Sequence, residues 1–310
     1  MNGLTVADTI KAITRDHLLR DGGILLGQCV SAVGWIGGTV PDCEGIVEIP
    51  MTDVAGPAFA VGAALMGRRP IFVVRYQGFM WYDCSSIVNY AAKSKQVWGV
   101  PVPIFIRAIA MEGNGIGHTA SSSMHSVFMH SPGLPVVAPM TPDEYCAAWK
   151  WFMEHDDPLY VSEHRRSFVL RSEMKDIVSD HSEITIIAIS AGRLNAIEAL
   201  DTLRDRGIEA DLFHLLWIKP FDPSDMILKS LTSTGLGLVI DSDFEIAGAS
   251  RSIAYELMHK ARVPIFALGL EDRVCGVAPE LENITPSTKR IFETVQKLVQ
   301  DKRAGTIKAF

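Results

Sequence analysis

GIVEIPMTDVAGPAFAVGAALMGRRPIFVVRY, residues 45–76, holds two short apolar runs on either side of a segment of small and apolar residues. The runs at 45–50 and 70–76 are bounded by glycine or proline, as buried strands are. The segment between them, 54–69, has its apolar residues at helical spacing. Strands that alternate with helices predict a parallel sheet, and therefore an α/β fold.

The same alternation continues on both sides of this stretch. Before a polar segment at 164–183, further strands are expected at 23–30, 102–110, 135–139 and 158–163, with helices at 85–98, 121–130 and 142–155. After it, strands are expected at 184–190, 209–218, 236–242 and 263–270, with helices at 195–207, 223–235, 248–261 and 286–302. The polar segment is interpreted as a linker, and a length of 310 residues suits two domains. The sequence predicts two α/β domains in series, at 1–175 and 176–310, each a parallel sheet with helices on both faces.

Composition excludes several classes of protein. With 48% apolar and 21% charged residues, the chain has too much core material for a disordered segment. A net charge of −7 argues against a nucleic-acid partner, which requires clustered Lys and Arg. The five cysteines are widely spaced with no CxxC pair, which favours a reducing compartment over a disulfide framework or zinc site.

The sequence also argues against a membrane protein. Its longest strongly apolar stretch, 55–67, is shorter than the roughly 20 residues that span a bilayer. The first 23 residues alternate charged and apolar positions, which indicates an amphipathic helix rather than a signal peptide. We therefore expect a soluble, cytoplasmic protein with neither a membrane nor a nucleic acid as partner.

Self-sufficient catalytic motifs are missing from the sequence. It contains no GxxxxGK[ST], GxSxG or HExxH motif and no EF-hand loop. The segment GIGHTA, 115–120, satisfies the relaxed dinucleotide pattern, but no acidic residue follows at the end of the next expected strand. A nicotinamide-dependent oxidoreductase therefore rests on a weak match. The loop is more typical of one that presents groups at the carboxyl edge of a sheet.

Several segments, in order along the chain, carry a resemblance to a known family. They are residues 48–93, VPVPIFIRA (100–108), HSPGLPVVAPMTPDE (130–144), DDPLYVSEHR (156–165) and the stretch at 196–222 that ends in KPFD. Together they resemble the β subunit of the decarboxylating component of 2-oxoacid dehydrogenases, such as pyruvate dehydrogenase. This thiamine diphosphate family is related to transketolase. The resemblance implies a pyrimidine-binding domain followed by a transketolase C-terminal-like domain.

The resemblance assigns three cofactor-binding residues. Asp53 stands where the family has a Glu whose carboxyl group bonds the pyrimidine ring nitrogen of thiamine diphosphate, a contact that promotes catalysis. Aspartate is shorter by one methylene, and its alternative role is to cap the helix that follows. Phe79 falls where an aromatic ring stacks on the aminopyrimidine, and Met51 would pack beside that ring. For both residues the alternative is ordinary core packing.

Histidines in the second half of this domain form a further set. The family histidine that meets substrate aligns with Ala120, whereas His118 lies two residues earlier in the glycine-rich loop. His118 is the candidate general acid or base, and its alternative is a solvent-facing loop histidine. His130 matches a family histidine near the cofactor, with support of the turn as the alternative. His125, spaced with apolar neighbours, is expected to pack in the core.

The Gly-Asp-Gly motif that binds diphosphate and Mg²⁺ in thiamine diphosphate enzymes does not occur in this sequence. We therefore expect no metal ligand in this chain. The resemblance implies that a separate α subunit supplies the motif, with thiamine diphosphate and Mg²⁺ bound between the chains, in an α₂β₂ assembly where two β chains also associate. The exposed part of 54–67 and of the aromatic stretch 76–82 would form such interfaces.

Three functions remain open at this stage. The first is a β-type subunit that cleaves a carbon–carbon bond next to a carbonyl, in a 2-oxoacid or ketose, and transfers the acyl or ketol fragment, to a lipoyl or carrier-protein acceptor in the parent family. The second is a split transketolase-like enzyme that moves a ketol unit from a sugar phosphate without decarboxylation. The third is a non-catalytic, structural or regulatory subunit.

Overall fold

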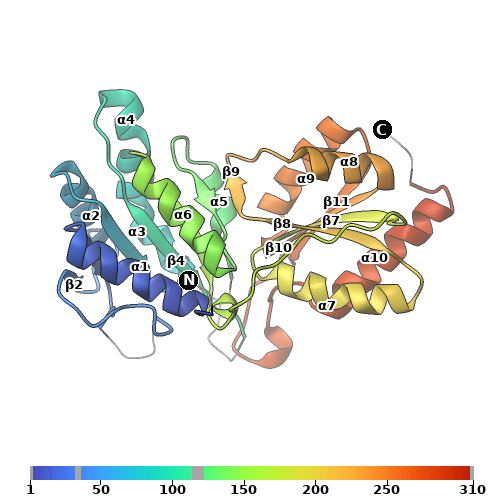
Figure 1. Cartoon of the computed structure of the whole chain (residues 1–310), viewed down its shortest axis with the longest axis horizontal. Coiled ribbons are helices and arrows are strands. Elements are labelled where there is room, and N and C mark those ends of the chain that lie inside the picture. The colour runs from blue at the N-terminus through green and yellow to red at the C-terminus, as the bar shows by residue number, and fades with distance from the viewer. Residues whose placement is uncertain (1–2, 32–35, 114–121, 308–310) are drawn as a thin grey trace. The chain divides into compact units, whose positions relative to one another are not determined.

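The computed structural model describes residues 3–31, 36–113 and 122–307 (Figure 1). The chain divides into two compact units. One comprises residues 1–173 with 218–220, and the other 174–217 with 221–310. Each is built on a sheet flanked by helices, so the predicted fold class, two α/β domains in series, is confirmed.

A seven-stranded sheet forms the centre of the first unit, in the order β2-β1-β3-β4-β6-β5-β9. Its strands are β1 (Ile24–Gly27), β2 (Ile46–Glu48), β3 (Pro70–Val74), β4 (Phe105–Ala110), β5 (Val136–Val137), β6 (Leu159–His164) and β9 (Trp217–Lys219). The pairs from β2 to β5 run parallel. Every residue of β3, β4 and β6 is buried, as expected of a parallel sheet covered on both faces.

Helices and short turns of the first unit cover this sheet. They are α1 (Val6–Arg20), α2 (Gly56–Leu65), η1 (Gln77–Phe79), α3 (Met80–Ser86), the π-turn η2 (Ile87–Ala91), α4 (Ala92–Trp98), α5 (His125–Met129), α6 (Pro142–Glu154) and η3 (Arg165–Ser167). Helix α1 packs against α6, while α2 packs against α3 and η2. Thr5 begins α1 with a capping box, and Thr141 caps α6 ahead of Pro142.

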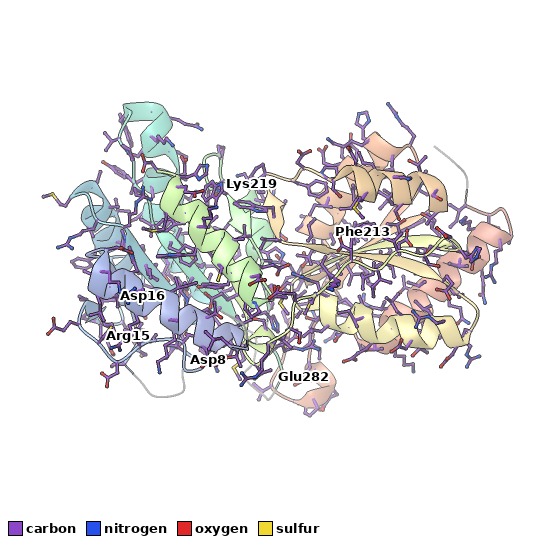
Figure 2. The ribbon with its side chains drawn as sticks, in the orientation of Figure 1. Asp8, Arg15, Asp16, Phe213, Lys219 and Glu282 are labelled. Carbon is purple, nitrogen blue, oxygen red and sulfur yellow. The ribbon has the colours of Figure 1, made fainter. Side chains whose placement is uncertain are left out.

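The second unit has a four-stranded parallel sheet in the order β11-β10-β7-β8. Its elements are β7 (Ile184–Ile189), α7 (Gly192–Asp205), β8 (Ala210–Leu215), α8 (Asp225–Thr234), β10 (Gly237–Phe244), α9 (Ala249–Ala261), β11 (Ile265–Leu270), η4 (Pro279–Leu281) and α10 (Thr288–Arg303). In Figure 1, α8 and α9 lie on one face of this sheet, and α7 and α10 on the other. Phe213 of β8 is fully buried in it (Figure 2).

The prediction of one strand at 209–218 is wrong. The chain forms β8 in the second sheet, leaves it after Leu215, and forms β9 beside β5 in the first sheet. Lys219 of β9 donates a hydrogen bond to the backbone oxygen of Ser131, which fastens this strand to the turn before β5 (Figure 2). Residues 212–218 contain no Gly, Pro, Asn, Asp or Ser, so no local sequence signal marks the point where the chain changes sheet.

Across the described ranges, the structure contains no helix with both the length and the apolar character required to cross a membrane.

Candidate active site at the carboxyl edge of the seven-stranded sheet

Strand order identifies the part of the first sheet where a ligand is expected. Strand β1 has β2 on one side and β3 on the other, so the connections after β1 and β2 lead in opposite directions across the sheet. Ligands of parallel α/β sheets bind outside the carboxyl ends of strands at such a switch point. Here those ends are Gly27, followed by Gln28, and Val74, followed by Arg75.

Asp53 lies in the loop after β2, on this edge of the sheet. Its side chain is half-buried, and the Gln28 amide Nε2 donates a hydrogen bond to Asp53 Oδ1 at 2.9 Å. The bond joins the loops that follow β1 and β2. The alternative role of Asp53 as a helix cap is wrong: α2 begins at Gly56, its N-cap is Ala55, and no side chain caps it.

Asp83, in α3, is a second carboxyl group of this region, and the sequence analysis did not select it. Its side chain is only 3% exposed, and Oδ1 has no hydrogen-bond partner in the described chain. Burial, and after it the negative charge of Asp53, raise the pKa of Asp83 to about 8. Asp83 is therefore mostly protonated at neutral pH.

Phe79 ends η1, just after β3, and is half-buried. The guanidinium carbon of Arg75 lies 5.6 Å from the centre of the Phe79 ring and 5.0 Å from that of Tyr76. The two aromatic rings are 5.8 Å apart. Phe79 thus packs on Tyr76 and Arg75, while part of its surface stays accessible. Stacking on a cofactor remains a prediction for this residue.

Gln77 holds this aromatic turn in place. It is fully buried, and its Nε2 donates to the Ala108 oxygen at 3.1 Å and to Ser162 Oγ at 2.9 Å, while its Oε1 accepts from the backbone N–H of Met124 at 2.6 Å. Ser162 Oγ also lies 3.0 Å from His125 Nδ1. His125 is fully buried, so its predicted packing role is confirmed. This network ties the turn after β3 to β4, β6 and the start of α5.

An ion pair crosses the centre of the sheet. Arg107 of β4 donates from Nε and Nη2 to the two carboxylate oxygens of Glu163 on β6, at 2.6 and 2.9 Å. Tyr145 of α6 donates to Glu163 Oε1 at 2.8 Å, and Arg107 Nη2 also donates to Thr39 Oγ1 at 2.8 Å. Burial and the Glu163 charge raise the pKa of Tyr145 well above its usual value. The pair fastens the loop after β1 to the middle of the sheet.

The ends of β4 and β6 add a second charged group to the same edge. Glu112 Oε1 lies 3.7 Å from His164 Nε2 and 3.5 Å from Arg166 Nη1. Glu112 and His164 are both buried, so this group anchors the start of the loop after β4. His118 and Ala120, in that loop, lie outside the described residues.

Two further predicted cofactor residues are exposed to solvent. Met51 is 67% exposed in the loop after β2, and His130 is exposed at the end of α5. Within the described parts of the chain, no hydrogen bond joins His130 to Asp53, Asp83 or Phe79. The structure therefore brings Asp53 together with Gln28, and the roles of Met51 and His130 stay predictions. The sequence signal that could have found Gln28 and Gln77 is a polar residue within three positions of the end of an apolar strand.

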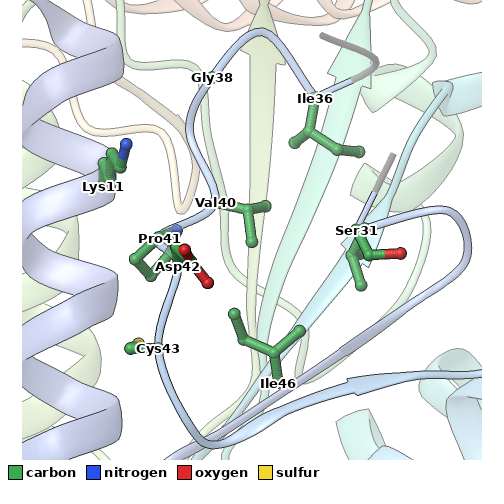
Figure 3. Close-up of a pocket in the computed structure, with 10 residues that line it drawn as sticks. Lys11, Ser31, Ile36, Gly38, Val40, Pro41, Asp42, Cys43 and Ile46 are labelled. Carbon is green, nitrogen blue, oxygen red and sulfur yellow. The ribbon is translucent and has the colours of Figure 1, made fainter. Parts of the chain in front are cut away.

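A cavity of this unit lies elsewhere. It has a volume of about 540 Å³ and lies between α1 and the chain that joins β1 to β2 (Figure 3). Val30, Ile36, Val40 and Ile46 line it, with Lys11 at its rim. None of the predicted site residues lines it, so the candidate site is the open edge of the sheet rather than this cavity.

The residues at the open edge suit a flat heteroaromatic ring with a basic nitrogen. Asp53 provides a carboxyl group, and Phe79 and Met51 provide accessible apolar surface. Within ranges 3–31, 36–113 and 122–307, no group of three His, Cys, Asp or Glu side chains is placed to hold a metal ion. The described edge therefore fits the pyrimidine of thiamine diphosphate, and it shows no set of residues for Mg²⁺.

Comparison with known proteins agrees with this division of the chain. Residues 44–169 match the transketolase pyrimidine-binding domain family and residues 175–291 match the transketolase C-terminal domain family. The chain is 28% identical to the acetoin:2,6-dichlorophenolindophenol oxidoreductase subunit beta of Cupriavidus necator, over 82% of this chain and 80% of that one. It is 25% identical to the pyruvate dehydrogenase E1 component subunit beta of Rickettsia felis, over 95% and 98% of the two chains.

Solved structures share the fold. A split-gene transketolase, described as an inactive β4 tetramer, superposes with a TM-score of 0.74 at 18% identity, and the match covers 96% of this chain and 99% of that one. Transketolase from Campylobacter jejuni superposes with a TM-score of 0.72 at 14% identity, and there the match covers 95% of this chain but 46% of the transketolase. Two domain families in series, together with relatives that match nearly end to end, identify the chain as a member of the transketolase-like family of thiamine diphosphate enzymes.

Proposed function

We propose that this chain is the β-type subunit of a two-chain thiamine diphosphate enzyme that cleaves a carbon–carbon bond next to a carbonyl and transfers the resulting acyl or ketol fragment. The observation that carries the proposal is the half-buried Asp53 carboxylate at the switch point, oriented by Gln28. The names of the relatives support the substrate class, because acetoin, pyruvate and 2-oxoisovalerate all contain a carbonyl beside the bond in question.

Each residue at the edge has a defined task in this function. Bound thiamine diphosphate supplies the carbon nucleophile and the electron sink. Asp53 holds the aminopyrimidine ring nitrogen through a hydrogen bond, and Gln28 restrains its carboxyl group by occupying Oδ1. Phe79 stacks on the ring, with Met51 beside it. His118 is the proposed acid or base toward the substrate, and His130 lies near the cofactor.

The partner we propose is an α-type chain that carries the diphosphate and Mg²⁺ motif. The residues that the structure describes include no metal-binding cluster, and the chain spans only 46% of a complete transketolase. Large apolar side chains are exposed on α2, at its C-cap and on α3, namely Phe59 at 59%, Met66 at 84% and Trp81 at 58%. A patch of this kind marks a protein–protein interface. We propose an α₂β₂ assembly in the cytoplasm, with a second β chain as a further contact.

The first experiment mixes this chain with a purified Gly-Asp-Gly-containing α chain, thiamine diphosphate and Mg²⁺. Activity is expected only when both chains are present. An isolated chain that turns over substrate would contradict the two-chain proposal. Release of carbon dioxide identifies a 2-oxoacid substrate, whereas fragment transfer without it identifies a split transketolase-like enzyme. Addition of a lipoyl domain or a carrier protein then identifies the acceptor.

A second experiment separates a catalytic subunit from a structural one. Asp53→Ala in the assembled complex is expected to lower turnover at least a hundredfold, because general acid–base contributions are typically of that size. Asp53→Glu, which restores the longer side chain of the family pattern, is expected to remain active. Asp16→Ala, an exposed carboxylate on α1, is the matched control (Figure 2). Unchanged turnover in Asp53→Ala would favour the non-catalytic role.

A further inference from the structure

The buried side chain of Gln77 has each of its hydrogen-bonding groups occupied. Its Nε2 donates to the Ala108 oxygen at 3.1 Å and to Ser162 Oγ at 2.9 Å. Its Oε1 accepts from the backbone N–H of Met124 at 2.6 Å and from the Tyr160 hydroxyl at 3.4 Å. Rotation of this amide by half a turn would set its N–H groups against the Met124 N–H. The contacts therefore fix a single orientation of the side chain.

The bond between Gln77 and Met124 joins two segments that leave adjacent strands. Gln77 begins η1, which follows β3 and ends at Phe79, whereas Met124 is the N-cap of α5, which follows β4. Strands β3 and β4 pair side by side, so both segments lie at the same carboxyl edge of the sheet. Methionine has no oxygen with which to cap a helix, and Gln77 instead supplies the acceptor at this end of α5.

The second end of the network fastens α5 to the sheet. The Phe128 ring of α5 stacks on the Tyr160 ring of β6, with 4.6 Å between their centres, and the Tyr160 hydroxyl donates to Gln77 Oε1. A buried polar network with all its members paired is rigid. The turn that carries Phe79 is therefore held against both the sheet and α5 through the side chain of Gln77.

We propose that Gln77 is a positioning residue whose amide holds the turn after β3 in register with the start of α5, and thereby sets the angle at which Phe79 faces the cofactor ring. The inference rests on the function proposed above. Because Gln77 is fully buried, it acts through Phe79 rather than through its own contact with the cofactor. Stacking depends on the offset and tilt of the two rings, so a small displacement of this turn weakens it.

Aromatic ¹³C NMR of the full chain tests the geometry without requiring activity. Gln77→Met keeps the length of the side chain but removes the acceptor for Met124 and both donors. The Phe79 ring signal, identified by its loss in Phe79→Leu, is expected to shift in Gln77→Met. A Phe79 signal at the wild-type position in Gln77→Met would overturn the inference.

Asn283→Leu is the matched control for the loss of a buried amide. Asn283 lies in the second unit and is 2% exposed. Its Nδ2 donates to the backbone oxygens of Glu271 and Arg273, at 2.9 and 2.8 Å, and its Oδ1 accepts from the Glu271 N–H at 3.2 Å. Asn283→Leu therefore breaks a similar set of bonds, and it is expected to leave the Phe79 signal unchanged.

Gln77→Glu separates the bond to α5 from the rest of the network. It keeps an oxygen that can accept from the Met124 N–H, so the Phe79 signal is expected to stay close to its wild-type position. A shift as large as that in Gln77→Met would assign the effect to the lost donors and would contradict the link to α5. Gln77→Asn, which draws the amide back by one methylene, replaces Gln77→Met if that variant does not fold, with the same expected shift.

Cofactor binding by the α–β complex completes the test. In Gln77→Met the dissociation constant for thiamine diphosphate is expected to rise about tenfold, the upper value of one aromatic stacking contact, while Asn283→Leu stays as wild type. Loss of stability alone would affect both variants alike. A wild-type complex that binds no thiamine diphosphate would contradict the proposed function, whereas equal affinity in wild type and Gln77→Met would contradict only this inference.

Discussion

The buried pair formed by Arg107 and Glu163 makes a quantitative prediction for Glu163→Gln. The substitution keeps the size of the side chain but removes the charge that faces Arg107. Glu163 accepts two hydrogen bonds from Arg107 and one from Tyr145, and the side chains of the pair are 0% and 2% exposed. Breaking such a pair by removing one partner costs about 3–5 kcal/mol, because the other charge stays buried without compensation.

The free energy of unfolding of the full chain, from urea titration followed by circular dichroism, measures this loss. Glu154→Gln is the matched control, since Glu154 makes an exposed i,i+4 pair with Lys150 and is expected to lose less than about 1 kcal/mol. Tyr145→Phe removes a single bond to a charged group and is expected to cost about 1.5–3 kcal/mol. A loss of less than about 1 kcal/mol in Glu163→Gln would refute the argument that the charge of Glu163 compensates Arg107.

The double variant Arg107→Met with Glu163→Leu isolates the source of the loss. It replaces both charges with apolar side chains, so no uncompensated charge remains in the sheet. Such replacements of buried pairs are often neutral or stabilising, and the double variant is therefore expected to exceed Glu163→Gln in stability. A double variant that is no more stable than the single one would assign the loss to packing or to the Thr39 contact instead.

Three further predictions concern the room for a Cβ atom at two glycines and the pH dependence of stability. Gly133→Ala is expected to cost about 2 kcal/mol or more, because φ is +78° and a Cβ there would lie 1.8 Å from the Ala92 backbone oxygen. Gly62→Ala is the matched contrast in α2, with no atom within 4 Å of the added Cβ, and is expected to stabilise the isolated chain by about 0.5–1 kcal/mol. Urea titrations of both variants check these values, and equal losses would contradict the geometry. Asp83 binds a proton more tightly in the folded chain, with a pKa of about 8 against an ordinary 3.8, so stability is expected to fall as pH rises between these values. From pH 6 to pH 8 the free energy of unfolding is expected to fall by about 2 kcal/mol in wild type and to show no such fall in Asp83→Asn. A similar fall in both proteins would exclude Asp83 as its source.

Strand and helix alternation made both sheets predictable, because the periodicity of apolar residues is a local property of the chain. The loop position of Asp53 followed from the same alternation, since it comes directly after the apolar run at 45–50. The split between β8 and β9 could not be predicted in this way. Residues 209–218 are rich in apolar residues and carry no glycine or proline, and their assignment to two sheets depends on which distant strands offer unpaired backbone groups.

Some residues of the candidate site could be predicted from the sequence, and others could not. The ordered resemblance to thiamine diphosphate enzymes identified Asp53 and Phe79, because the family pattern is carried by contiguous residues. It could not identify Gln28, Gln77 or Asp83, whose importance comes from partners on other loops, such as Asp53 for Gln28 and Ser162 for Gln77. The helical periodicity of α3 does not reveal which residues pack over Asp83 and exclude water from its carboxyl group.

The sequence by itself therefore determined the fold class, the family and the predicted cofactor carboxylate of this protein, since each is carried by residues close together in the chain. Which groups surround that carboxylate depends on the tertiary structure alone. Hydrogen bonding, desolvation and charge coupling act through space, and the loops after β1, β2 and β3 meet only once the parallel sheet has formed.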